Sequence, residues 1–277
     1  MKVHCEVEPG WMGRVMYRFV EAIKRFAPES VFFVQRAEEA DLQILQVIGL
    51  GSLPFLKCKD YVVFQHCFLT SETRAWLGIW EKARLVASCY DLPSMLPGNY
   101  RFHRMPMGVD SAKWSEVTEQ KRYLCMATGY DPAQEAIREM FDTCYSLGGT
   151  LVHVNRNFNW GKGYVNYDNI SDEKMQELYS KSQFVSALRH TEGFELPAVE
   201  GLLCGARPVM FDLPCYRYWF NDVALFVEEK HGVALVQDLV RVLSSPKPVE
   251  ENERNWARRK FDWSVIIPEL WRTILGA

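Results

Sequence analysis

The sequence predicts an α/β protein made of two Rossmann-like domains, each a doubly wound parallel sheet covered by helices. Three observations support this prediction. Short β-rich runs alternate with segments of helical period along most of the chain. This alternation restarts after a stretch rich in proline and glycine between residues 91 and 110. The 277 residues are 48% hydrophobic and 24% charged, which fits a globular protein with one large or two medium-sized domains.

The first domain is expected to span residues 1–115. A helix is predicted from Gly13 onward, because apolar residues between Val15 and Ile23 recur on one face. Runs rich in β-branched and aromatic residues predict strands at 31–34, 42–48, 61–65 and 84–88. Residues 49–54 are interpreted as a loop, since they lack the third glycine of a dinucleotide-binding fingerprint. A linker is expected around residues 113–120.

The second domain is expected to span residues 116–250 and to repeat the same alternation. Its strands are predicted at 123–128, 151–154, 184–188 and 208–211. Asp131 suits a helix cap and Pro132 the first helical position. Gly148 and Gly149 then suit the end of that helix.

Three more helices and a helical tail complete the second half. The helices are predicted from Ser171, after Pro197 as far as Gly205, and over residues 232–243. The tail, residues 251–277, is expected to be helical with a break or kink at Pro268, because proline lacks an amide hydrogen. We expect that this tail can cross back to the N-terminal domain.

Charge and cysteine usage limit the cellular setting. Thirty-two Lys and Arg residues against 35 Asp and Glu residues give a net charge of −3, so no global positive field attracts nucleic acid or acidic lipid. The eight cysteines form no C-x-x-C pair, which favours reduced thiols. The N-terminus lacks the apolar run of a signal peptide, and no apolar stretch of about 18 residues occurs. We therefore expect a cytoplasmic protein with no membrane span.

The most informative segment joins a strand to the helix at Pro197. Loops at the carboxyl ends of strands bind ligands in open α/β sheets, and the first amides of a helix can hold a phosphate. Glu192 stands before this helix and Glu200 one turn into it. Two carboxylates beside an anion site need partners that donate hydrogen bonds, such as sugar and ribose hydroxyls. The pattern therefore predicts a nucleotide-sugar site.

This segment resembles the signature of the retaining nucleotide-sugar glycosyltransferases of family four, which have the GT-B fold. In that family two glutamates are separated by seven residues in a pattern of the kind E-G-F-G-L-P-x-x-E-A-x-A-C-G-x-P-V. The residues shared here are Glu192, Gly193, Phe194, Leu196, Pro197, Glu200, Cys204, Gly205, Pro208 and Val209. Fainter similarities, at Phe64–His66, Met107–Asp110, Asn169–Tyr179 and Lys260–Ser264, extend the resemblance over nearly the whole chain.

The resemblance implies a compact GT-B enzyme whose two domains face a cleft and which retains the anomeric configuration of the sugar. It assigns Glu200 to the ribose hydroxyls and Glu192 to the donor sugar. The expected catalytic residues are Glu192, His66 and Arg189. The expected donor-binding residues are Glu200, Gly193, Phe194, Glu195, Leu196, Gly10, Gly13, Lys162 and Arg156. The implied partner is a nucleotide-sugar donor, and the acceptor is left open.

The sequence departs from the family at two places near the donor. The arginine and lysine that usually follow the first strand of the second domain are missing, and Arg156, Lys162 and Arg189 are the candidates to replace them. Arg189 is the best placed, three residues before Glu192. Glu195 stands where glycine is common and adds a carboxylate. Neither a cofactor nor a metal is expected, because a helix dipole and basic side chains offset the donor charge and no D-x-D triplet occurs.

Alternatives stay open at this level. Arg189 could simply be the salt-bridge partner of nearby acidic residues, and His66 a buried histidine satisfied by the backbone. A rival function is a DNA-modifying glycosyltransferase acting on a hydroxylated base, suggested by the aromatic and cationic run 155–164 and by basic residues in the tail, although the negative net charge disfavours it. A second rival is a catalytically silent nucleotide-sugar-binding module.

Overall fold

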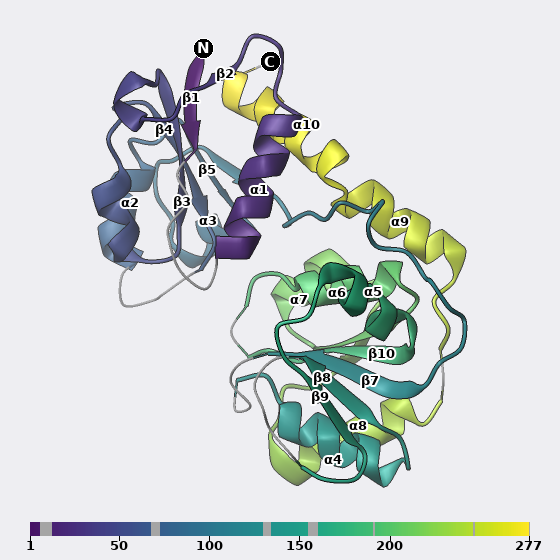
Figure 1. Ribbon diagram of the computed structural model, residues 1–277. Helices are drawn as coiled ribbons and strands as arrows, with labels where there is room; N and C mark the ends of the chain where they lie inside the picture. Colours follow the sequence, from purple (N-terminus) through teal and green to yellow (C-terminus); the bar gives the residue numbers. More distant parts are fainter. Residues whose placement is uncertain are drawn as a thin grey trace. The chain divides into compact units, whose positions relative to one another are not determined.

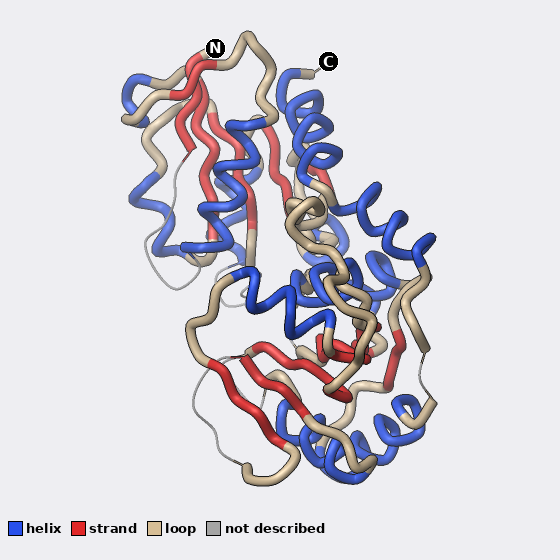
Figure 2. Tube along the Cα trace, turned by 45° about the vertical axis from the view of Figure 1, so that its right-hand side comes forward, coloured by secondary structure: helices blue, strands red, loops and turns tan. Residues whose placement is uncertain are grey.

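The computed structural model describes residues 1–5, 13–67, 73–129, 134–154, 160–190, 192–245 and 247–276. The chain divides into two compact units. The first, here called the N-domain, comprises Met1–Gly108 and Trp263–Ala277, and the second, the C-domain, comprises Val109–Asp262. In each unit a layer of strands is flanked by helices (Figures 1 and 2).

The N-domain contains a parallel sheet in the order β2-β1-β3-β4-β5-β6. Its strands are β1 (Lys2–Cys5), β2 (Phe32–Phe33), β3 (Leu42–Val47), β4 (Tyr61–Gln65), β5 (Leu85–Ser88) and β6 (Phe102–Arg104). The register places Leu45 of β3 opposite Val63 of β4. The strand order reverses between β1 and β3, which is the arrangement of a doubly wound sheet.

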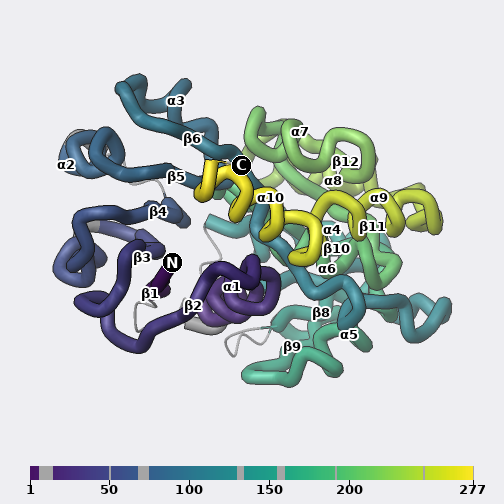
Figure 3. The backbone as a smooth tube through the Cα atoms, turned by 90° about the horizontal axis from the view of Figure 1, so that it is seen from above, coloured from purple at the N-terminus to yellow at the C-terminus, as the bar shows by residue number. Residues whose placement is uncertain are grey.

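Helices cover both faces of this sheet. They are α1 (Gly13–Arg25), α2 (Thr73–Trp80), α3 (Leu92–Met95) and α10 (Trp263–Leu275), with short 3₁₀ helices at η1 (Ala37–Glu39) and η2 (Leu50–Phe55). Val63 packs in a core with Trp76 of α2, whereas the next residue, Phe64, lies 4.4 Å from Phe19 of α1 between ring centroids. Helix α10 lies beside α1 (Figure 3). Because helices bury both faces of the sheet, the sequences of its strands are nearly continuous apolar runs.

The C-domain has a second parallel sheet, in the order β12-β11-β10-β7-β8-β9. Its strands are β7 (Tyr123–Thr128), β8 (Leu151–Val154), β9 (Tyr164–Tyr167), β10 (Ser182–Ala187), β11 (Arg207–Phe211) and β12 (Leu225–Val227). From β7 the chain runs outward through β8 and β9, then returns to place β10 on the other side of β7. The strand order therefore reverses between β7 and β10, where ligands bind in open α/β sheets.

The helices of the C-domain form two layers. They are α4 (Ile137–Ser146), α5 (Asp172–Ser180), α6 (Leu196–Leu203), α7 (Pro214–Phe220), α8 (Gly232–Leu243) and α9 (Glu251–Phe261). Helices α4 and α8 pack together on one face of the sheet, and α5 and α6 lie on the other, with α9 against α6 (Figure 1). The side chain of Ser171 accepts a hydrogen bond from the amide of Lys174 and caps α5, as predicted.

The predicted fold class, α/β with two doubly wound parallel sheets, is confirmed. Of the predicted break or kink at Pro268, the break is wrong, because the tail breaks at Asp262 and α10 continues through Pro268. Asp262 is extended, forms a β-bridge with Val109 and accepts a hydrogen bond from the amide of Ser111 at 2.9 Å. These contacts end α9 before the proline is reached.

Two smaller predictions also need correction. Residues 50–55 form η2 instead of a loop, since the amide of Ser52 bonds back to the carbonyl of Gly49 at 3.0 Å. Helix α4 begins at Ile137, because Ala136 adopts a left-handed conformation with φ of 46°. The predicted cap at Asp131 and the following Pro132 lie outside the described residues.

Candidate functional site

The carboxyl ends of β7 and β10 lie side by side at the reversal point of the C-domain sheet, because these two strands pair in parallel. Glu135 comes from the segment that follows β7, and Arg189 from the segment that follows β10. Glu192 and Glu195 lie between Arg189 and the start of α6. These four residues are in contact and are called the Arg189 cluster below.

Three carboxylates contact the single guanidinium, each at a different nitrogen. Nη2 of Arg189 lies 3.2 Å from Oε1 of Glu135. Nη1 lies 3.4 Å from Oε1 of Glu192, and Nε lies 3.3 Å from Oε1 of Glu195. The carbonyl oxygen of Arg189 accepts a hydrogen bond from the hydroxyl of Tyr216 at 3.0 Å, which fixes its backbone.

Burial differs sharply within the cluster. The side chains of Glu195 and Glu135 are 2% and 8% exposed, whereas that of Glu192 is 32% exposed. Burial raises the pKa of Glu195 to about 8, although Arg189 acts to lower it. Burial also raises the pKa of Glu192. Burial acts to lower the pKa of Arg189, but the three carboxylates outweigh it and raise that pKa, so the guanidinium stays charged.

Glu135 was not among the sequence-predicted site residues. Its carboxylate lies against the α-carbon of Gly129, where an added Cβ would be 1.7 Å from Oε2. The carbonyl of Gly129 is 3.2 Å from Nε2 of His153, whose Nδ1 is 2.7 Å from the hydroxyl of Tyr164. The signal that could have pointed to Glu135 is its place in the segment after β7, where the resemblance expects basic residues.

Glu200 is held apart from the guanidinium contacts of the Arg189 cluster. It lies in α6, is 7% exposed, and accepts a hydrogen bond at Oε2 from the hydroxyl of Tyr179 at 3.3 Å. Burial, together with the charge of Glu200, raises the pKa of Tyr179 well above its ordinary value. Tyr179 therefore donates as a neutral phenol and orients the Glu200 carboxylate from α5.

The loop between Glu192 and α6 is anchored by aromatic packing. The ring of Phe194 lies between 5.3 and 5.8 Å from the rings of Trp219, Phe220 and Phe261. Glu195 is the N-cap residue of α6 but makes no side-chain cap hydrogen bond, and α6 itself begins at Leu196. The first turn of α6, whose amides at Leu196 and Ala198 have no partner within the helix, thus adjoins a loop that is packed at Phe194 and also contains Gly193.

His66 lies in the N-domain, directly after β4. Its Nε2 is 2.9 Å from Oε1 of Gln46. Burial lowers the pKa of His66 to about 3, so the ring is neutral near pH 7. Within the described residues, the partner of Nε2 is thus a glutamine side chain. Gly13, in the same domain, begins α1.

The remaining predicted residues are not part of the Arg189 cluster as described. Lys162 is exposed in the turn before β9. Gly10 and Arg156 lie outside the described residues. Arg189 is thus the predicted basic residue that the structure places beside Glu192, and it is the salt-bridge partner of that carboxylate.

Three basic residues of the tail have partners within the C-domain. Arg254 pairs with Glu116 at 2.9 Å and Arg258 with Glu251 at 2.7 Å. Lys260 donates to the carbonyl of Trp219 at 2.9 Å and lies 4.6 Å above the ring of Trp256. These contacts favour a structural role for these three cations over nucleic-acid binding.

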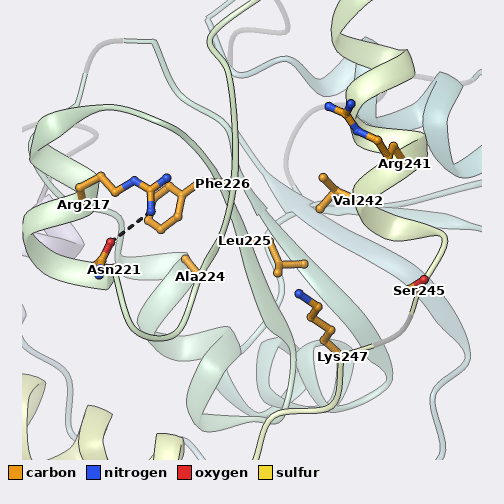
Figure 4. Close-up of a pocket in the computed structure, with 9 residues that line it drawn as sticks. All are labelled: Arg217, Asn221, Ala224, Leu225, Phe226, Arg241, Val242, Ser245 and Lys247. Carbon is orange, nitrogen blue, oxygen red and sulfur yellow. Dashed lines mark hydrogen bonds between the residues drawn. The ribbon is translucent and has the colours of Figure 1, made fainter.

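A pocket of about 500 Å³ lies at the amino end of β12, away from the carboxyl edge of the sheet. Figure 4 shows its lining: Arg217, Asn221, Ala224, Leu225, Phe226, Arg241, Val242, Ser245 and Lys247. Arg217 pairs with Asp212 at 2.6 Å and Arg241 with Asp238 at 2.8 Å. Both arginines stand in the last turns of their helices, where cations are favoured by the helix dipole. We therefore assign them a structural role.

No group of three or more His, Cys, Asp or Glu side chains in the described ranges is arranged to hold a metal ion. No helix there is both long and apolar enough to cross a bilayer.

No family model matches the sequence, and no curated protein matches it either. Solved structures do match. Sucrose-phosphate synthase from Thermosynechococcus elongatus has a TM-score of 0.77 at 12% identity, covering 99% of both chains. AviGT4, a glycosyltransferase involved in avilamycin A biosynthesis, has a TM-score of 0.69 at 14% identity, covering 100% of this chain and 99% of its own.

The pneumococcal O-GlcNAc transferase GtfA, in complex with UDP and GlcNAc, has a TM-score of 0.63 at 12% identity and covers 95% of this chain and 60% of its own. These neighbours are GT-B glycosyltransferases, and two parallel six-stranded sheets with flanking helices are the fold they share with this chain. The chain therefore has the GT-B fold, in a compact form of 277 residues. The expected fold is confirmed.

Proposed function

We propose that this protein is a retaining glycosyltransferase of the family-four kind, which moves a sugar from a nucleoside diphosphate to a hydroxyl acceptor. One observation carries this proposal: Arg189 and Glu192 meet at the reversal point of the C-domain sheet, directly before the first turn of α6. Open α/β sheets bind ligands at such points. The GtfA structure, which contains UDP and GlcNAc, gives further support for a nucleotide-sugar donor.

Each residue near this point has a chemical role in the proposal. Arg189 and the free amides of α6 would pair with the diphosphate, because both present positive charge. Glu192 would accept hydrogen bonds from the sugar, and Glu200, oriented by Tyr179, from the ribose. The loop residues Gly193, Phe194, Glu195 and Leu196 would shape the donor site.

The proposed reaction exchanges one bond at the anomeric carbon. The bond to the leaving phosphate oxygen breaks, a bond to the acceptor oxygen forms on the same face, and the acceptor proton passes to the leaving phosphate. The neutral ring of His66 and the backbone at Gly13 and Gly10 would contribute from the N-domain. Lys162 and Arg156 are further proposed donor contacts. No metal takes part in this scheme, in which the dipole of α6 and these basic side chains offset the charge of the leaving phosphate.

The test is donor binding by the full-length protein. Thermal shift with UDP-, GDP- and ADP-sugars identifies the donor, because a true ligand stabilises the folded state. Calorimetry then compares wild type with Glu200→Ala and with Glu119→Gln, a control at an exposed position. We expect Glu200→Ala to weaken donor binding at least about tenfold, which equals about 1.4 kcal/mol, and the control to match wild type. Unchanged affinity in Glu200→Ala would refute the ribose assignment.

A catalytically silent nucleotide-sugar-binding module is the second candidate. The observation that favours it is the crowding of three carboxylates around Arg189, which weakens the positive field available to a leaving diphosphate. Release of free nucleotide from the identified donor, measured over hours, separates the two candidates. Turnover supports the enzyme, and binding without any release supports the silent module.

A further inference from the structure

The Arg189 cluster carries excess negative charge before any donor binds. One guanidinium faces three carboxyl groups. With Glu195 neutral the formal charge of the cluster is still −1, and with all three ionised it is −2. A diphosphate brought to this cluster meets a cation that already contacts three carboxylates. Repulsion between these carboxylates and the diphosphate favours the release of one of them from Arg189.

The geometry identifies Glu192 as the carboxylate that can leave. Its Oε1 accepts a hydrogen bond from Nη1 of Arg189 at 3.4 Å, and its side chain is 32% exposed, so water can solvate it when it moves. Glu135 is 8% exposed and pressed against Gly129. Withdrawing a buried carboxylate from its cation costs far more than withdrawing an exposed one.

Glu195 is buried even more deeply than Glu135. It is 2% exposed, and its Oε1 accepts no hydrogen bond within the described residues. That atom lies 3.3 Å from Nε of Arg189, and deep burial keeps the side chain from reaching water if it leaves the guanidinium. Glu135 and Glu195 thus hold Nη2 and Nε in place from two sides, and Nη1 is the nitrogen at the exposed carboxylate.

We propose that donor binding exchanges charges at Arg189: a diphosphate oxygen replaces Glu192 at Nη1, and the released Glu192 carboxylate turns to the hydroxyls of the sugar. Glu135 and Glu195 are positioning residues that keep the guanidinium at the β7–β10 edge during the exchange. This inference rests on the proposed function. As a consequence, the sugar and the diphosphate favour each other's binding. The sugar hydroxyls donate hydrogen bonds to the carboxylate that the diphosphate has displaced from Arg189.

The exchange predicts opposite effects of one substitution on two ligands. Glu192→Gln removes the charge that competes with the diphosphate, so a bare nucleoside diphosphate should bind about twofold to fivefold tighter, the range expected for a partly exposed ion pair. The same variant should bind the nucleotide-sugar more weakly than wild type, because the freed carboxylate is missing. Glu135→Gln should weaken the binding of both ligands, since Arg189 loses the ion pair that positions its Nη2.

The experiment uses calorimetry with UDP, GDP and ADP and with the corresponding nucleotide-sugars on wild type, Glu192→Gln and Glu135→Gln. Asp142→Asn is the matched control, because Asp142 pairs with Arg138 at 3.1 Å in an exposed ion pair of the same domain. Tighter nucleotide binding and weaker nucleotide-sugar binding in Glu192→Gln support the exchange. If wild type binds a nucleotide and Glu192→Gln binds it equally or more weakly, the exchange is overturned while the proposed function stands.

Two other outcomes are also decisive. If wild type binds none of the three nucleotides and none of their sugars, the proposed function fails and the exchange fails with it. If Glu135→Gln folds and binds both ligands as wild type does, its positioning role is overturned. Because Glu192 is partly exposed, we expect Glu192→Gln to fold. This variant therefore tests the exchange even if Glu135→Gln is unstable.

Discussion

Glu195 makes the stability of this protein depend on pH in an unusual direction. Burial raises the pKa of this carboxyl from 4.5 to about 8 in the folded chain. Between these two values the folded state binds more protons than the unfolded state at this site. Stability from this group is therefore fully present below about pH 4.5 and is lost as the pH rises toward about 8. The perturbation that isolates it is Glu195→Gln, which mimics the protonated acid and does not titrate.

The size of the effect follows from the same pKa change. A difference of about 3.5 between the folded and unfolded pKa values corresponds to at most about 5 kcal/mol. The value is an upper bound, since Glu192 and Glu135 share the same guanidinium with Glu195. Relative to wild type, Glu195→Gln should gain little at pH 4.5 and several kcal/mol, at most about 5, at pH 9.

The assay is urea unfolding of both proteins at five pH values from 4.5 to 9, followed by circular dichroism. Asp142→Asn, at an exposed position, serves as the control and should show a constant difference from wild type. The expected result is a difference in unfolding free energy that grows with pH. A difference between Glu195→Gln and wild type that is flat, or that grows toward acid, would refute the assignment of Glu195 as a buried carboxyl with a raised pKa.

Two further substitutions test the contacts that hold Glu135 and Glu200 in place. Gly129→Ala places a Cβ 1.7 Å from Oε2 of Glu135, so it should lower the unfolding free energy by about 1–3 kcal/mol. Gly78→Ala has no atom within 4 Å of the new Cβ and should be neutral or stabilising; equal thermal denaturation midpoints for the two variants would contradict the clash. Tyr179→Phe removes the donor to Glu200 and should cost about 1–3 kcal/mol as well as donor affinity. Chemical denaturation measures the unfolding free energy, and calorimetry measures the donor affinity. If both quantities equal those of wild type, the hydrogen bond does not orient Glu200.

The elements that sequence patterns predicted best are those with one dominant physical cause. Strands β7 and β8 match their predicted ranges, because buried parallel strands are apolar runs bounded by turns. Helix α8 also matches, since its apolar residues recur with helical period. By contrast, β9 and β12 were not predicted. They are edge strands whose residues are mostly half-buried, so they lack the buried apolar run that marks β8, which is equally short.

The residues of the site also differ in whether the sequence could predict them. Arg189 could be predicted because it is close in sequence to Glu192, and the loop before α6 has a recognisable pattern of glycine and proline. Glu135 could not, since it is distant from Arg189 in the chain and the two meet only because β7 pairs with β10. Burial of Glu195 likewise depends on tertiary packing, which no local pattern encodes.

The most direct test is a crystal structure of the full chain with its donor nucleotide bound. We predict that the diphosphate contacts Arg189 at Nη1 and the first amides of α6, while the ribose hydroxyls donate to Glu200. A nucleotide bound away from the β7–β10 edge, with Arg189 still joined to all three carboxylates, would contradict the account.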